Sequence, residues 1–155
     1  MAAVGVSLGQ GTDSLNLTLD PEPENAAIAR HAVGDLAARL GIGDAVRTSA
    51  EVVVTEAFTN ATRHAYVNGS PAPIEVSASA DADQLEISVR DHGTGFRPRP
   101  VKPGGGGRMG LLLMAAVADS VRFLHLRGGG TEVCAAVTPE SAWRGLREPA
   151  ECPGC

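Results

Sequence analysis

The chain has 155 residues, a formal net charge of −5 at pH 7, 43% hydrophobic residues and 20% charged residues. This length and composition suit one globular domain that needs no disulfide or metal staple, and they exclude an intrinsically disordered chain. The negative charge argues against direct binding to nucleic acid or to an anionic membrane, and one Trp, one Tyr and three Phe are too few for base-stacking platforms.

No stretch approaches the roughly 20 consecutive apolar residues that span a bilayer, and the N-terminus lacks the charged and apolar segments of a secretory signal. We therefore expect a cytoplasmic protein. The terminal CPGC has CxxC spacing, but no second pair of ligands accompanies Cys152 and Cys155. This favours a frayed tail over a zinc or redox site.

The first half of the chain predicts one strand and two helices. Residues 1–13 are small and polar, so we expect a flexible leader. LNLTLD (15–20) alternates Leu with polar residues, as a half-buried strand does. A helix that starts with Pro and acidic residues should end at Gly41, and Asp44 can cap a longer helix to about Tyr66. The apolar stripe of that second helix is Val46, Ala50, Val53, Ala57 and Ala61.

The second half predicts a sheet interrupted by a long loop. IEVSAS (74–79) and LEISVR (85–90) should form an antiparallel hairpin. The Gly- and Pro-rich segment 91–108 is long enough to be a lid or a binding loop, and MGLLLMAAVADS (109–120) has the composition of a buried helix. VRFLHL (121–126) and TEVCAAVTP (131–139) should be strands around the turn RGGG, before a C-terminal tail at 139–155.

This order of elements predicts an α+β two-layer sandwich. Its sheet should be mixed but mostly antiparallel, and about three helices should cover one face. There is no internal repeat and no second domain, so residues 14–138 are expected to form a single folded unit.

A polar stripe crosses the second predicted helix in TEAFTNATRHAY (55–66). Residues four apart on a helix are separated by only about 40° around its axis, so Glu56, Asn60 and His64 share a face. For an isolated stripe of this kind, a solvated face is the ordinary interpretation. Two glycine motifs elsewhere in the chain favour a binding site instead.

Both glycine motifs lie at the ends of predicted elements. DHGTGF (91–96) follows a strand, which places the Asp91 carboxylate at a cleft edge where glycine backbone can approach a ligand closely. GGGGRMG ends at Gly110, where a helix begins, and the unpaired N–H groups of a helix N-terminus suit phosphate. Each motif alone is a weak signal.

Together, and in this order, the motifs resemble the Bergerat-type ATPase fold of histidine kinases, gyrase, Hsp90 and MutL. TEAFTNATRHAY is similar to the N box, DHGTGF to the first glycine box and GRMGLLLM to the second. The chain most resembles the anti-sigma-factor serine/threonine kinases, because E-A-x-T-N-A-x-x-H followed by a small residue and Tyr is typical of that branch. Under this resemblance, residues 14–138 are the ATPase domain.

The resemblance implies roles for individual residues. Asn60 matches the Mg²⁺ ligand, and Glu56 matches the carboxylate that orients or deprotonates the attacking hydroxyl. Asp91 matches the acceptor for the adenine amino group. Gly93 and Gly95 match the backbone that approaches the base. Gly110 matches the start of the phosphate-binding helix, and Thr131 matches a threonine that supports the adenine end.

Arginines would have to help offset the phosphate charge, since the sequence contains no P-loop motif and its only lysine is Lys102. Arg63 matches a phosphate-contacting position of histidine kinases, and Arg108 in the loop is a second ATP-binding candidate. Arg108 also departs from the family pattern, since many relatives have glycine there. Arg30 has the spacing from Glu56 of a partner-contacting arginine, although a surface arginine without a role fits equally well. His64 fits the motif but receives no catalytic role.

The resemblance implies an ATP- and Mg²⁺-dependent kinase that sequesters a sigma factor and phosphorylates an anti-sigma antagonist protein. A homodimer is also expected. Two alternatives stay open from the sequence: an ATP-binding module that sequesters its partner without phosphotransfer, and an ATP hydrolase that performs conformational work.

Overall fold

The computed structural model describes the whole chain except residues 1–4, 8–12, 68, 82, 95–108 and 147–155. A six-stranded sheet forms one layer, and its neighbouring strands are all antiparallel. In spatial order the strands are β1 (Gly5–Ser7), β2 (Ser14–Leu19), β5 (Ile74–Asp81), β6 (Gln84–Arg90), β8 (Thr131–Val137) and β7 (Ser120–His125). The helices are α1 (Asn25–Arg39), α2 (Asp44–Thr62), α3 (Met109–Val117) and α4 (Pro139–Leu146).

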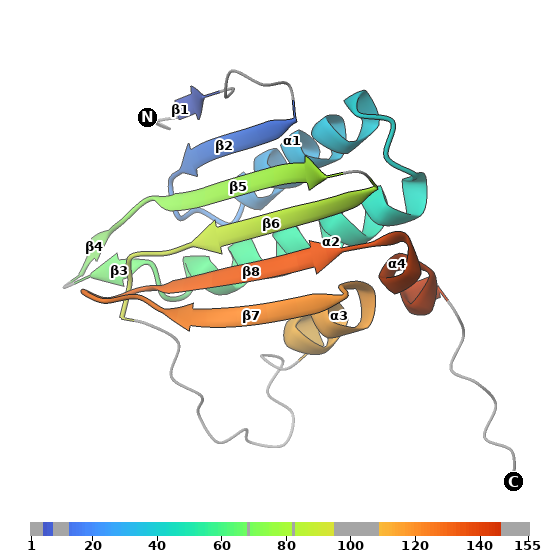
Figure 1. Cartoon of the computed structure of the whole chain (residues 1–155). Helices are drawn as coiled ribbons and strands as arrows, with labels where there is room; N and C mark the ends of the chain where they lie inside the picture. Colours follow the sequence, from blue (N-terminus) through green and yellow to red (C-terminus); the bar gives the residue numbers. More distant parts are fainter. Residues whose placement is uncertain (1–4, 8–12, 68, 82, 95–108, 147–155) are drawn as a thin grey trace, which may run out of the picture.

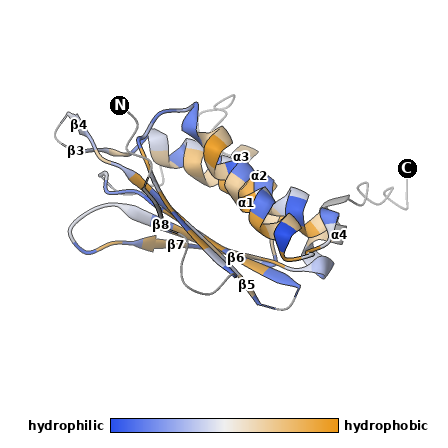
Figure 2. Ribbon diagram, turned by 90° about the horizontal axis from the view of Figure 1, so that it is seen from above, coloured by the Kyte–Doolittle hydropathy of each residue, from blue (hydrophilic) through white to orange (hydrophobic). Residues whose placement is uncertain are grey.

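The described helices all lie on one face of the sheet, and none of them covers the other face (Figures 1 and 2). This arrangement follows from the alternation along the strands, where every second residue of β2, β6 and β8 and of β5 up to Ala78 is buried. The predicted two-layer α+β sandwich is therefore confirmed. Among the described strands the sheet contains no parallel pair, so it is antiparallel rather than mixed.

Helix α2 is the central element of the helical layer. It packs on α1, on α3 and on strands β6 and β8. Its predicted apolar stripe is buried throughout, and Phe58 beside that stripe is fully buried. Because this stripe is anchored in the core, the rotation of α2 about its axis is fixed, and with it the direction of the polar residues Glu56 and Asn60.

Two helix boundaries differ from the sequence prediction. Helix α2 ends at Thr62, not near Tyr66, and a small hairpin of β3 (Tyr66–Val67) and β4 (Ser70–Pro71) follows it. Gly69 between these strands has a φ of 81°, a conformation that glycine adopts without a steric penalty. At the other end of α2, Gly43 is the N-cap and Asp44 is the first helical residue.

Short elements also lie in the segments predicted as leader and tail. Strand β1 pairs with β2 through Gly5–Ser7, and α4 packs against α2 and α3. Three residues of β1 carry too little alternation to be detected in a sequence. Residues Cys152 and Cys155 of the CPGC motif lie outside the described residues.

Helix α3 is not the buried helix that its composition suggests. Only Gly110 and Met114 are buried, whereas Met109, Leu112 and Leu113 are exposed. The segment MGLLLMAAV contains no polar residue, so its sequence gives no periodicity that would distinguish a buried from an exposed side. Among the described residues, no helix has the length and apolar character required to cross a bilayer.

Candidate functional site

A narrow pocket lies between the C-terminal half of α2 and the ends of β6, β8 and β7. Its polar residues are Asn60, His64, Asp91 and Thr131. Its walls are Ala57, Ala61, Val89, Phe123 and Val133. The pocket thus brings together residues of the N box, the first glycine box and the last strand. Asn60 and Thr131, two of these residues, are 71 positions apart in the sequence.

Sheet pairing brings Asp91 and Thr131 to the same end of the sheet. Strands β6 and β8 pair up to Arg90 and Glu132, and the Asp91 N–H then donates to the Thr131 carbonyl at 2.9 Å. Gly130 has a φ of 100°, and a β-carbon there would overlap the Asp91 carbonyl oxygen. The predicted RGGG turn therefore needs glycine at this position.

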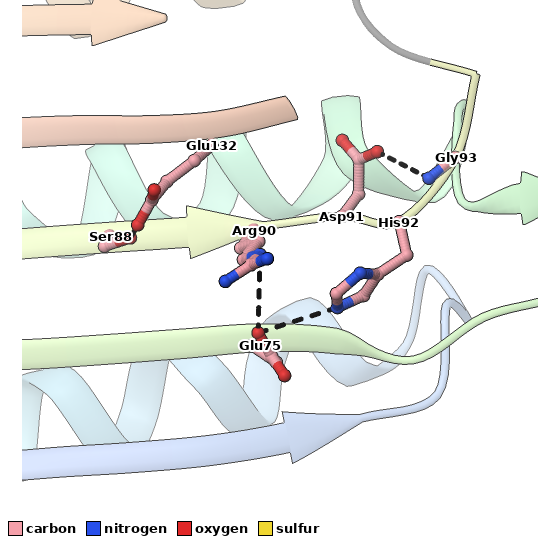
Figure 3. Close-up of polar contacts among 7 residues, drawn as sticks. All are labelled: Glu75, Ser88, Arg90, Asp91, His92, Gly93 and Glu132. Atoms are coloured by element: carbon pink, nitrogen blue, oxygen red, sulfur yellow. Dashed lines mark hydrogen bonds and ion pairs between the residues drawn. The ribbon is translucent and has the colours of Figure 1, made fainter. Parts of the chain in front are cut away.

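The Asp91 carboxylate is buried, with 4% of the residue exposed. Its Oδ1 accepts a hydrogen bond from the Gly93 N–H at 3.0 Å. Figure 3 shows this carboxylate directed away from the side of the strand on which His92 and Glu75 lie. Within the described part of the chain no other hydrogen bond or ion pair engages it, so one oxygen is left to accept a bond from a ligand.

Gly93 packs directly against the end of the N box. A β-carbon on Gly93 would overlap the His64 carbonyl oxygen and lie 3.1 Å from the Ala65 nitrogen. Only glycine allows this close backbone approach. The first glycine box is therefore needed for packing against the chain that follows α2, in addition to any contact with a ligand.

Gly110 makes the corresponding contact with Glu56. It lies in the first turn of α3, and a β-carbon there would overlap Oε2 of Glu56 and lie 3.3 Å from its Cδ. Glu56 is half-buried, one turn of α2 before Asn60. The second glycine box thus lies against the predicted catalytic carboxylate.

The two predicted basic residues that the structure describes, Arg63 and Arg30, are not part of this pocket. Arg63 is exposed at the C-cap of α2, and Arg30 is exposed on α1 with its guanidinium 3.5 Å from His31 Nε2. Neither residue lines the pocket. Gly95 and Arg108 lie outside the described residues.

The pocket left by the described residues is small. Its open volume is about 20 Å³, which is enough for about one water molecule. This volume is smaller than a planar base. The polar groups are thus in place around a cavity that a ligand would have to widen.

The open face of the sheet carries a separate set of polar contacts. Arg90 Nε and His92 Nε2 lie 3.8 and 3.6 Å from Glu75 Oε2 (Figure 3). The Ser88 hydroxyl donates to Glu132 Oε1 at 2.6 Å. Ser88, Arg90 and His92 alternate with Val89 and Asp91 along the chain, so the two sides of this stretch face different surfaces.

His64 is the pocket residue to which the sequence assigned no role. It lines the pocket together with Asn60 and Asp91. The spacing in the sequence did indicate that His64 belongs to the site, since it is four residues after Asn60 along the stripe that begins at Glu56. The helix ends at Thr62, however, so that spacing alone did not fix its direction.

Comparison with known proteins gives one family match. A family model described as the histidine kinase-like ATPase domain matches residues 19–137. The serine-protein kinase RsbW of Listeria monocytogenes is 27% identical over 129 residues, which cover 75% of this chain and 82% of that protein. RsbW of Oceanobacillus iheyensis is 28% identical with the same coverage.

Two further matches are shorter or more distant. The anti-sigma F factor of Halalkalibacterium halodurans is 32% identical over 84 residues, covering 54% of this chain and 58% of that protein. A crystal structure of the RsbU and RsbW domains of a Mycobacterium tuberculosis protein has a TM-score of 0.63 at 23% identity. The match covers 81% of this chain and 32% of the longer chain in the crystal structure. This similarity supports the fold.

Proposed function

This chain belongs to the histidine kinase-like ATPase domain family, and we propose that it is an ATP-dependent anti-sigma-factor serine/threonine kinase. It would bind a sigma factor and phosphorylate a Ser or Thr of an antagonist protein. The names of its relatives, serine-protein kinase RsbW and anti-sigma F factor, support this class of activity. The family match over 19–137 supports an ATPase domain at 14–138.

The adenine end of the site would be Asp91 and Thr131. A buried carboxylate with one oxygen held by the Gly93 N–H and the other available is suited to accept a bond from an exocyclic amino group. This favours adenine over guanine, which presents a carbonyl oxygen at the equivalent position. The donor set therefore fits the proposed nucleotide.

The phosphate end would be Asn60, Gly110 and the arginines Arg63 and Arg108. Asn60 offers a neutral amide oxygen to Mg²⁺, a hard cation that prefers oxygen ligands. The first turn of α3 at Gly110 offers backbone N–H groups to phosphate. When bound, ATP would supply the phosphoryl group and Mg²⁺ would offset its negative charge.

Glu56 would orient the acceptor hydroxyl and accept its proton. Its carboxylate lies against Gly110, so the proposed proton acceptor and the proposed phosphate-binding helix are neighbours. Catalysis would then come mainly from positioning and charge stabilisation. This contact between Glu56 and Gly110 is the observation on which the proposed reaction rests.

The proposed sigma factor would contact another surface. Arg30 is exposed on α1, where a sigma factor could reach it without entering the pocket. The family resemblance supports a homodimer and a cytoplasmic location, and sedimentation of the purified protein would test the first of these.

Phosphotransfer assays test the proposal. The wild-type protein is incubated with γ-labelled ATP and each candidate antagonist encoded by a neighbouring gene. Label should move to a Ser or Thr of one antagonist. Glu56→Gln should reduce the transfer rate by about 10²- to 10⁴-fold, the usual contribution of a general base, while ATP binding persists.

Glu51→Gln is the matched control, since Glu51 is a half-buried glutamate of the same helix that pairs with Arg47 at 3.5 Å and has no proposed role in the reaction. Partner binding without transfer would favour the sequestering module instead. Release of inorganic phosphate without a labelled protein would favour an ATP hydrolase.

A further inference from the structure

Helix α3 presents an exposed apolar surface. Met109 and Leu112 are each 64% exposed and Leu113 is 40% exposed; we call these three residues the α3 patch. Within the described part of the chain, six large apolar residues are exposed, and three of them lie on this nine-residue helix. A cluster of this kind marks an interaction surface more often than single exposed leucines do.

The α3 patch lies beside the proposed reaction centre. Residues three and four apart share a helix face, so Leu112 and Leu113 lie near Met109 on the exposed side. The buried residues Gly110 and Met114 lie on the side that packs toward α2. Because Gly110 contacts the Glu56 carboxylate, the α3 patch begins one residue from that contact.

We propose that the α3 patch is the docking surface for the protein that receives the phosphoryl group. This inference rests on the proposed kinase function. Gly110 in the first turn of α3 lies against the Glu56 carboxylate, so a folded protein that brings its hydroxyl to Glu56 would come close to this turn. The patch is therefore continuous with the site at which the acceptor must bind.

The chemistry of the helix specifies the partner surface. MGLLLMAAV has no charged side chain and no side chain that forms strong hydrogen bonds. A charged group pressed against it would lose its hydration without gaining a partner. The acceptor protein should therefore present small or apolar residues, without charge, beside its acceptor Ser or Thr.

The size of the patch fits a transient contact. A stable interface buries about 800 Å² on each partner and engages about 20 to 30 residues a side. Three side chains on one helix fall far below that area. They are suited to a substrate that must dissociate after each transfer, and they do not suffice for a second copy of this chain.

Leucine-to-glutamine variants test the inference. Leu112→Gln and Leu113→Gln should each raise KM for the antagonist by about tenfold or more in the labelled-ATP assay. The kcat at saturating antagonist and the Kd for ATP measured by calorimetry should stay within about twofold. Leu124→Gln is the matched control, because Leu124 on β7 is 43% exposed, close to the 40% of Leu113, and should leave KM unchanged.

Several results would overturn the inference. One is an unchanged KM in both α3 variants. Another is a sedimentation result in which the wild-type protein is a dimer and the Leu112→Gln variant is a monomer. That result would assign the α3 patch to a second copy of this chain. A third is loss of sigma-factor binding with normal antagonist binding.

A protein without kinase activity would give a different result from a protein whose α3 patch does not bind the antagonist. In that case the wild-type protein would bind an antagonist without labelling it. Calorimetric titration of that antagonist into the Leu112→Gln variant would then decide the inference by itself. Weakened binding would support docking on α3, and unchanged binding would contradict it.

Discussion

The backbone carbonyl oxygen of His64 occupies the place that a β-carbon on Gly93 would need. His64 follows the C-terminus of α2, and Gly93 follows the end of β6. The N box and the first glycine box are therefore packed backbone to backbone. Asp91, which is linked to Gly93 by a hydrogen bond, takes its direction from the same contact.

Gly93→Ala should destabilise the fold and weaken ATP binding together. The added methyl must push the two backbones apart, and overpacking of this kind typically costs about 1 to 3 kcal/mol. Urea unfolding measures the free energy of unfolding, and calorimetry measures ATP affinity. Thr94→Ala changes the exposed neighbouring residue and should leave both values near wild type. Wild-type stability in Gly93→Ala would contradict the close packing described above.

Asp91→Asn should weaken ATP binding while the fold is retained. The amide oxygen can still accept the Gly93 N–H, but the amide cannot replace a carboxylate that accepts on both oxygens. A hydrogen bond to a charged group contributes about 1.5 to 3 kcal/mol, so ATP affinity should fall by about 10- to 150-fold. Calorimetry with ATP measures this change. Equal affinities in the variant and the wild type would refute the adenine-binding role.

The strands around this site could be predicted from sequence because each has one buried face. The alternation in IEVSAS and LEISVR is a period-two signal that no helix produces, and both segments are strands in the structure. The residues facing the pocket follow from that alternation. Asp91 comes directly after Arg90, so it points to the opposite side, toward α2.

The details that the sequence left open depend on tertiary contacts. The hairpin of Tyr66–Val67 and Ser70–Pro71 was not predicted, since Tyr66 was placed at the end of the helix, although an Asn-Gly pair between its strands is a hairpin signal. The exposure of Leu112 could not be predicted, because an all-apolar segment has no polar face to indicate direction. The contact between Gly110 and Glu56 joins residues that are 54 positions apart in the sequence, and neither a glycine nor a glutamate predicts such a contact by its type.

Gly110→Ala should slow phosphotransfer without destabilising the protein. The new methyl displaces the flexible Glu56 carboxylate, not backbone, and alanine is favoured over glycine in a helix by about 0.8 to 1 kcal/mol. We expect kcat to fall by about tenfold or more, since small misplacements of a catalytic group are costly. Single-turnover transfer from labelled ATP measures the rate, and thermal unfolding measures stability.

Gly34→Ala controls for a methyl introduced against a glutamate. A β-carbon at Gly34 on α1 would overlap Oε1 of Glu51, so the local steric change is similar, but Glu51 pairs with Arg47 and has no proposed role in the reaction. This variant should transfer phosphate at the wild-type rate. If both glycine variants slowed transfer equally, the effect would belong to helix packing and not to the position of Glu56.

Cys134 should react slowly with alkylating reagents at neutral pH. Burial raises the pKa of the Cys134 thiol, and the negative charge of Glu132, two residues earlier on β8, raises it further. The thiolate is the nucleophile, so alkylation by iodoacetamide should reach its half-maximal rate at a higher pH than for a free cysteine. The measurement uses a background with Cys152→Ser and Cys155→Ser, in which Cys134 is the only thiol.

Glu132→Gln should lower the pKa of Cys134 and so shift the alkylation profile toward lower pH. The sign follows from the charge: an anion beside the thiol disfavours the thiolate, and removing that anion increases the thiolate fraction at a given alkaline pH. Glu75→Gln removes an exposed carboxylate on β5, one that does not contribute to the raised pKa, and should leave the profile unchanged. A shift toward higher pH in Glu132→Gln would contradict the effect assigned to the charge of Glu132.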